Sequence, residues 1–179
     1  MKKIVLSILL LVNILISYSQ ESFPKSWIGK YKGNLEIYAV DSIAMRLKME
    51  LDIQSTSIDS VYNWTITYDF KGQKDIRSYQ LIIVNAEKGI YQIDEKNSII
   101  IDAFYRKNIF TSFFEVMNSF IIATYTKSKE NTIIFEIISA KANAISTTGG
   151  EKINDEEIPE VKSYQMNGRQ RAILYKIPQ

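Results

Sequence analysis

Strict alternation of apolar and charged residues is the feature that most constrains how this chain can fold. The clearest run covers residues 45–53, in which Met45, Leu47, Met49, Leu51 and Ile53 alternate with Arg46, Lys48, Glu50 and Asp52. A period of two puts the apolar side chains on one face of a β-strand and the charged side chains on the other. Residues 30–37 and 62–70 show the same period. We therefore expect strands that each have one apolar face and one face in water.

Strand-like segments follow one another along the rest of the chain without a helical pattern between them. Residues 79–84, 89–94, 98–105, 109–117, 120–126 and 132–139 are rich in Ile, Phe, Tyr and Thr, which fit a pleated surface. The connectors are short and polar, so neighbouring strands are expected to pair antiparallel. Such strands hide an apolar face in a barrel or a sandwich. Because a meander closes without crossing connections, we predict an all-β, antiparallel up-and-down meander barrel of about 8–10 strands.

Two features near the C-terminus predict local structure. Asn167-Gly168 lies between the strand-like residues 161–166 and 169–177, and Asn-Gly favours the type I′ turn of a tight hairpin. We therefore predict a terminal hairpin at this point. Residues 141–160, which include Gly149-Gly150, are predicted to form a long, mobile connection with room for one more short strand.

The first residues have the pattern of a secretory signal peptide. Lys2 and Lys3 precede a mostly apolar stretch at residues 4–16, which is followed by the small residues Ser17 and Ser19. The apolar stretch is shorter than the roughly 20 residues that span a bilayer. We predict a signal peptide at 1–19, a single domain at 20–179, and a soluble product exported to the periplasm or to the outside of the cell.

Charge and missing residue types exclude several functions. The chain has 22 Lys and Arg against 20 Asp and Glu, and loss of the two leader lysines leaves the mature chain neutral. A neutral chain lacks the cationic field that attracts nucleic acid, so no nucleic-acid partner is expected. The chain has no Cys and no His, which removes thiolate and imidazole metal ligands and the usual pairs of catalytic nucleophile and base. We therefore expect no cofactor and no metal site.

Carboxylates are the main remaining route to acid–base catalysis. Asp94-Glu95 falls at a predicted hairpin, where Asp commonly caps a turn, and adjacent strand residues point to opposite faces. Residues 155–157 are acidic but lack the spacing of a calcium loop. Neither set favours an active site, so the chain is predicted not to be an enzyme. Catalysis by Tyr, Lys or carboxylates is the open alternative.

An outer-membrane barrel is the rival to a barrel in water. Such barrels turn their apolar side chains outward around a polar lumen. Here the charged row of residues 46, 48, 50 and 52 would crowd a narrow lumen with ionised groups. We therefore expect no stable membrane insertion.

The first strand-like segment resembles a known family. Residues 27–35, Trp-Ile-Gly-Lys-Tyr-Lys-Gly-Asn-Leu, are similar to the first strand of the calycin superfamily, specifically of bacterial lipocalin-like exported proteins. In that family the first-strand Trp closes the barrel floor under an Arg from the last strand. The resemblance implies that Trp27, Gly29 and Arg171 close the barrel here, with the guanidinium over the indole face as a cation–π contact. The glycine stands two residues after the Trp, whereas lipocalins proper have it two residues before.

The same resemblance implies a central cavity for a small apolar or amphipathic molecule. The residues expected to form the cavity wall are Tyr31, Leu35, Leu47, Met49, Trp64, Tyr68 and Phe70. Barrels of this size either fill their interior with side chains or hold one small ligand, so a packed core is the alternative for the same residues. In that case the chain is expected to be a protein-interaction module that uses residues 141–160 or a sheet edge, with its protein partner unknown.

Overall fold

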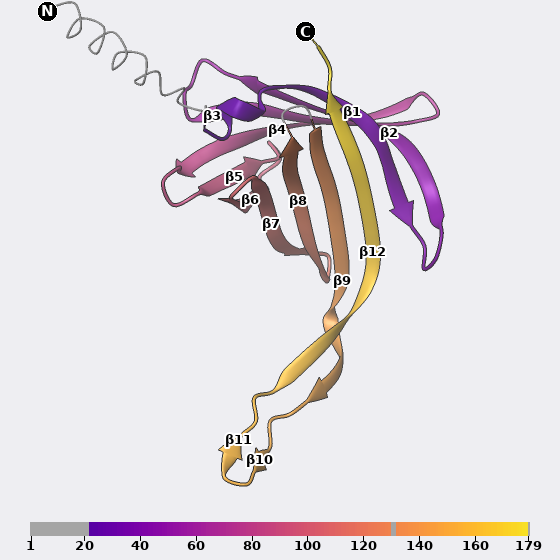
Figure 1. Cartoon of the computed structure of the whole chain (residues 1–179), viewed down its shortest axis with the longest axis vertical. Coiled ribbons are helices and arrows are strands. Elements are labelled where there is room, and N and C mark those ends of the chain that lie inside the picture. The colour runs from indigo at the N-terminus through magenta and orange to yellow at the C-terminus, as the bar shows by residue number, and fades with distance from the viewer. Residues whose placement is uncertain (1–21, 130–131, 179) are drawn as a thin grey trace, which may run out of the picture.

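The computed structural model describes residues 22–129 and 132–178, and in them ten strands form one closed antiparallel barrel (Figure 1). The barrel strands are β1 (Gly29–Tyr38), β2 (Ile43–Ser55), β3 (Val61–Phe70), β4 (Gln73–Asn85), β5 (Ile90–Asp94), β6 (Ile100–Arg106), β7 (Ile109–Val116), β8 (Ser119–Lys129), β9 (Thr132–Thr148) and β12 (Val161–Lys176). Each strand pairs with its neighbour in sequence, and β12 closes the barrel against β1. The predicted fold class is therefore confirmed. The predicted signal peptide at 1–19 lies outside the described residues.

On β2, the strand with the clearest alternation, the apolar face points into the barrel. On β2, Met49, Leu51 and Ile53 are fully buried, whereas Glu50, between them, faces outward and pairs with Lys32 of β1 at 2.8 Å. The alternation in the sequence thus separates the core inside the barrel from a charged outer surface. No helix in the described part of the chain is long and apolar enough to cross a membrane.

Aromatic side chains close one end of the barrel. The segment before β1 forms a short 3-10 helix, Lys25–Trp27, and buries Phe23 and Trp27. The ring of Phe23 stacks on Tyr105 with centroids 4.4 Å apart and meets the edge of Trp27 at 4.9 Å. The hydroxyl of Tyr31 donates a hydrogen bond to the carbonyl oxygen of Trp27 at 2.9 Å. The closed end is therefore packed by residues that precede the first strand.

The predicted terminal hairpin at Asn167-Gly168 is wrong, because β12 runs without a turn from Val161 to Lys176. Gly168 pairs with Ser139 of β9, and the register shifts between Met166 and Gly168. Residues on both sides of Asn167 thus pair with the same strand, β9. The Asn-Gly pair lies at an irregularity of one long strand rather than at a reversal.

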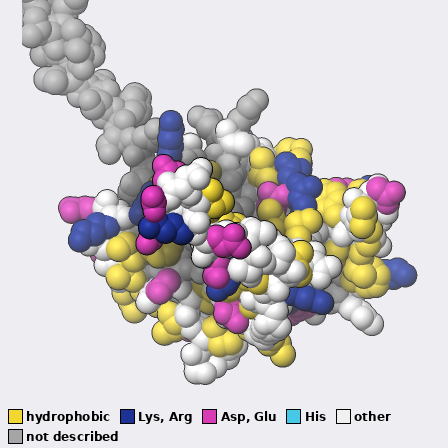
Figure 2. All heavy atoms as spheres, turned by 90° about the horizontal axis from the view of Figure 1, so that it is seen from below, with side chains coloured by type: hydrophobic (Ala, Val, Ile, Leu, Met, Phe, Trp, Pro, Cys, Tyr) yellow, Lys and Arg dark blue, Asp and Glu magenta, His cyan; other side chains and the backbone are white. Residues whose placement is uncertain are grey.

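Residues 141–160, predicted to be a long connection, largely continue the β-structure. Beyond the barrel, β9 and β12 stay paired up to Thr148 and Val161, and the short pair β10 (Lys152–Ile153) and β11 (Glu156–Glu157) forms the tip. We call residues 142–166 the ribbon. Figure 1 shows it extending from the end of the barrel opposite the 3-10 helix. Figure 2, a view from that end, shows apolar, basic and acidic side chains intermingled.

Candidate functional site

A small cavity lies inside the barrel, in the half away from the 3-10 helix. Its volume is ≈ 110 Å³. The lining has seven aromatic residues (Trp64, Tyr68, Tyr79, Phe110, Phe114, Tyr125, Phe135), five aliphatic residues (Ile66, Ile93, Ile101, Ala123, Ile137) and three polar or charged residues (Arg77, Glu95, Ser112). The site is thus an apolar pocket with few polar groups, the usual make-up of a small-molecule site.

Small residues on neighbouring strands explain why the barrel is hollow at this level. Ser112 of β7 pairs with Ala103 of β6 on one side and with Ala123 of β8 on the other. Most other inward positions nearby carry large side chains. Of these three small residues, Ser112 and Ala123 line the cavity, and their short side chains leave space that the surrounding rings do not fill. The cavity is therefore a consequence of strand register, which brings residues distant in sequence side by side.

Four aromatic rings form the wall beside these small residues. Trp64 lies 5.4 Å from Phe110 and 5.1 Å from Tyr125, measured between ring centroids. Tyr125 in turn lies 4.9 Å from Phe135. Tilted and edge-on rings at these separations are the favoured arrangements of aromatic pairs. They give the cavity a fixed wall that suits a flat, apolar molecule.

Charged residues stand on the same inner face, at the end of the cavity toward the β3–β4 hairpin. Arg77 pairs with Asp75 at 3.0 Å, and its guanidinium lies 5.0 Å from the centroid of the Tyr68 ring. Burial, followed by the charge of Glu95, raises the pKa of Tyr79, and Arg77 acts on the same hydroxyl in the opposite direction. Arg77, Tyr79 and Glu95 thus form one polar group, which we call the polar rim.

Burial also keeps other tyrosine hydroxyls of the barrel protonated. It raises the pKa of Tyr68 and that of Tyr31 to about 12, and it raises the pKa of Tyr125 from its usual value as well. The cavity therefore presents neutral phenol groups at physiological pH.

These pKa shifts predict a loss of stability at alkaline pH. An unfolded tyrosine ionises near pH 10, so between pH 10 and 12 the unfolded chain has lost protons that folded Tyr31 and Tyr68 retain. We expect the free energy of unfolding to fall with rising pH across this window in urea titrations. The double variant Tyr31→Phe/Tyr68→Phe should show a smaller fall than the matched outer-face variant Tyr175→Phe. A parent protein whose stability is flat to pH 12 would contradict the assignment.

The sequence-predicted cavity residues fall into three groups. Trp64 and Tyr68 line the cavity. Tyr31, Leu35, Leu47 and Met49 face the core but lie outside this lining. Phe70, at the end of β3, is 39% exposed. Ligand contact by these residues stays a prediction. Within the set, only Trp64 and Tyr68 line the cavity.

The predicted contact of Arg171 with Trp27 is wrong. Ala172 and Leu174 are the buried residues of β12, so Arg171, between inward positions, faces outward and pairs across the sheet with Glu36. Trp27 and Gly29 do lie at the closed end, where the last strand contributes Lys176 instead.

Gly29 makes room for Lys176 at the closed end. A Cβ at Gly29 would lie 2.4 Å from Cε of Lys176, and the φ of +140° at Gly29 is one that other residues rarely adopt. The ammonium of Lys176 lies 5.9 Å from the centroid of the Tyr31 ring. The cation of the last strand therefore meets a tyrosine of the first strand, not the tryptophan.

Sequence reasoning missed most of the cavity lining. Arg77 precedes the segment expected to start at residue 79, whereas β4 begins at Gln73. Ser112 and Ala123 were not singled out, since they are small residues within strands. Two signals in the sequence pointed to the lining. A reversal at Lys71-Gly72 sets Trp64 opposite Tyr79, and small residues interrupt the inward rows of bulky side chains.

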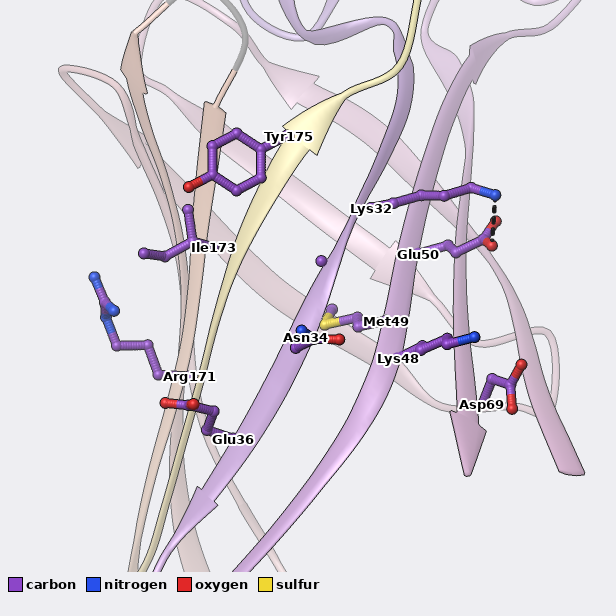
Figure 3. Close-up of a pocket in the computed structure, with 11 residues that line it drawn as sticks. Lys32, Asn34, Glu36, Lys48, Met49, Glu50, Asp69, Arg171, Ile173 and Tyr175 are labelled. Atoms are coloured by element: carbon purple, nitrogen blue, oxygen red, sulfur yellow. Dashed lines mark ion pairs between the residues drawn. The ribbon is translucent and has the colours of Figure 1, made fainter. Parts of the chain in front are cut away.

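A larger groove, of ≈ 680 Å³, lies on the outer surface over β1, β2 and β12 (Figure 3). Arg171 and Glu36 lie beside each other there, and Lys32 pairs with Glu50. Arg46, then Tyr38, and more weakly Arg171 lower the pKa of Glu36. The groove is open and carries exposed charges of both signs, of which Lys32 pairs with Glu50 and Glu36 pairs with Arg46. The candidate site is therefore the interior cavity.

Comparison with known proteins shows the fold. No protein-family model and no curated protein matches this chain. An S-type phycobiliprotein lyase from Guillardia theta matches with a TM-score of 0.58 and 6% identity, over 87% of this chain and 90% of that chain. A protein of unknown function of the DUF3598 family from Nostoc punctiforme matches with a TM-score of 0.54 and 9% identity, over 86% of this chain and 48% of that one, so this chain spans about half its length. At identities of 6% and 9% these likenesses show the fold alone, and the chain therefore shares the β-barrel fold of these two proteins.

Proposed function

We propose that the mature chain, once exported, binds a small apolar or amphipathic molecule inside the barrel and does not transform it. The observation that carries this proposal is the cavity of ≈ 110 Å³ among seven aromatic residues. A protein interior is normally packed to the density of an organic crystal, with few voids larger than a water molecule. A space of this size is therefore available to a ligand.

The volume sets the size of the ligand. An engineered apolar cavity of about 150 Å³ binds benzene. A cavity somewhat smaller than that suits a molecule built on a single ring. The fold shared with a phycobiliprotein lyase supports binding in a barrel of this type, while the ligand proposed here is limited by the space between Trp64, Phe135 and their neighbours.

Filling the cavity should abolish binding without unfolding the barrel. Ala123 lines the cavity, so Ala123→Leu places three more carbon atoms in it. We expect toluene to bind the parent protein in isothermal titration calorimetry and to raise its midpoint of thermal unfolding. Ala123→Leu should lower the affinity at least tenfold, since the volume that the ring needs is occupied.

The matched control is Ala144→Leu, which makes the same substitution at an exposed position of the ribbon. This variant should bind toluene like the parent protein. Equal toluene affinity in Ala123→Leu and Ala144→Leu, or no binding to the parent protein, would overturn the proposal.

A protein-interaction module is the second candidate function, and the ribbon favours it. Exposed apolar residues follow one another along it: Ile145, Ile153, Ile158, Val161, Tyr164 and Met166. Among the described residues, β9 pairs only with β12 beyond the barrel, so one edge of each strand has no described strand beside it there. Such edges accept further strands. Replacing residues 142–166 with a short turn should remove a protein partner and leave toluene binding unchanged, whereas filling the cavity should do the reverse.

A further inference from the structure

Ser112 is a buried polar side chain that the fold does not explain. It is 7% exposed and is the one polar or charged residue classed as buried in the described part of the chain. Its side chain lines the cavity, and its hydroxyl makes none of the hydrogen bonds found among the described residues. Since no fully buried side-chain oxygen in these residues lacks a partner, the Ser112 hydroxyl is accessible from the cavity. A hydroxyl that opens onto an apolar cavity without a protein partner can donate a hydrogen bond to a bound molecule. An alanine would pack equally well between Ala103 and Ala123.

A second hydroxyl in the same lining is in a similar state. The ring of Tyr68 contacts the Arg77 guanidinium, but the Tyr68 hydroxyl has no hydrogen-bond partner within the described residues. Tyr68 is on β3 and Ser112 on β7, so the two hydroxyls come from different walls of one cavity. Both hydroxyls are therefore free to donate to a bound molecule.

The charges of the cavity argue against an ionised ligand. Arg77 and Glu95 both belong to the lining and have opposite signs, and Asp75 holds Arg77 at 3.0 Å. A carboxylate ligand would meet the like charges of Glu95 and Asp75, and an ammonium ligand would meet that of Arg77. Either ion would also lose its hydration among the aromatic rings, which is costly without a dedicated partner. An uncharged ligand avoids both penalties.

From these observations we propose that Ser112 and Tyr68 are specificity-determining residues, and that the ligand is an uncharged, single-ring molecule with a hydrogen-bond acceptor such as a carbonyl oxygen. The proposal rests on the proposed function, because it assigns the chemistry of a ligand in the same cavity. The two hydroxyls donate to the acceptor, the rings of Trp64 and Phe135 pack against the ligand ring, and the polar rim excludes ions.

Four probes of similar size test this proposal by calorimetry: acetophenone, toluene, benzoate and benzylamine. Acetophenone should bind the parent protein roughly fivefold or more tightly than toluene, which is the gain expected from one net hydrogen bond. Benzoate and benzylamine should bind at least tenfold more weakly than acetophenone. Binding of acetophenone no tighter than toluene, or tighter binding of either ion, would overturn the proposal.

Variants separate a binding role from a structural one. In Ser112→Ala/Tyr68→Phe, the ratio of the toluene Kd to the acetophenone Kd should fall to about one. The Kd of toluene itself should stay as in the parent protein. Ser112→Ala alone should unfold at about the same temperature as the parent, because the Ser112 hydroxyl makes no hydrogen bond to the protein. Thr111→Val, which removes a hydroxyl at the next position of β7, is the matched control and should keep the preference.

The outcomes distinguish the two proposals. A preference that persists in Ser112→Ala/Tyr68→Phe would overturn the role of the two hydroxyls. Equal binding of toluene and acetophenone would leave the proposed function standing and remove this inference. Failure of both probes to bind the parent protein would remove both.

Discussion

Replacing Trp64 with alanine is expected to lower the free energy of unfolding by about 3–5 kcal/mol, the range found for large aromatic residues in protein cores. Trp64 is 1% exposed, and its ring meets Tyr125 edge-on at 5.1 Å and Phe110 at a tilt at 5.4 Å. Its removal deletes these contacts and also merges the indole volume with the existing cavity. Urea unfolding followed by circular dichroism measures the loss.

The control for Trp64→Ala is Thr65→Ala, the next residue of β3, on the outer face. We expect this change to cost less than about 1 kcal/mol, as for most surface substitutions. Because the cavity grows, Trp64→Ala should also admit a two-ring probe such as naphthalene, which the parent protein excludes. Similar losses of stability for the two variants would contradict the inward orientation of Trp64.

Replacing Phe23 with alanine is the second change with a large expected effect, about 3–5 kcal/mol of unfolding free energy. Phe23 lies before the first strand, yet it is 5% exposed and contacts four other rings. These are Trp27 at 4.9 Å, Tyr91 at 5.0 Å, Tyr105 at 4.4 Å and Phe110 at 5.1 Å. Without it, the closed end of the barrel opens to water.

Thermal unfolding of Phe23→Ala beside Lys25→Ala, an exposed residue of the same segment, tests this role. Lys25→Ala should change the unfolding midpoint little. If Phe23→Ala behaved in the same way, the segment before β1 would not be part of the folded barrel.

Period-two alternation and short connectors together were enough to predict the barrel, because each strand needs one face away from water and a meander closes without crossing connections. Alternation was not enough to orient β12. On that strand the outward row contains Ile173 and Tyr175, whereas the inward row contains the small Ala172. The inward side is crowded: a Cβ at Gly33 would lie 2.0 Å from the carbonyl oxygen of Ile173, so β1 and β12 approach closely there. The more apolar row is thus the outer one, and Arg171 shares it.

The Asn-Gly signal failed for a different reason. A turn at Asn167 competes with pairing of β12 to β9, and residues 161–175 of β12 pair with β9 along almost their whole length. The sum of these ladder contacts outweighs the preference of two residues for a turn. A short turn signal predicts a chain reversal only where the flanking residues cannot form a longer pairing with another strand.

The cavity could not be located from the sequence because it depends on register between strands. Ala103, Ser112 and Ala123 are about ten residues apart along the chain and become neighbours only when β6, β7 and β8 pair as they do. The same holds for Tyr68 and Arg77, which meet across the β3–β4 hairpin. Trp64 and Tyr68 were found because they belong to a strongly alternating strand.

The most direct measurement of the central claim is a methyl spectrum of protein with ¹³C-labelled alanine during titration with acetophenone. If a ring-sized molecule enters the barrel, the resonance of Ala123 should shift with increasing probe until it saturates, while that of Ala144 on the ribbon stays in place. The shift should disappear when the cavity is filled by Ser112→Leu. An unchanged Ala123 resonance at saturating probe, or a shift confined to the ribbon, would show that the barrel interior is closed to ligands and would contradict the account.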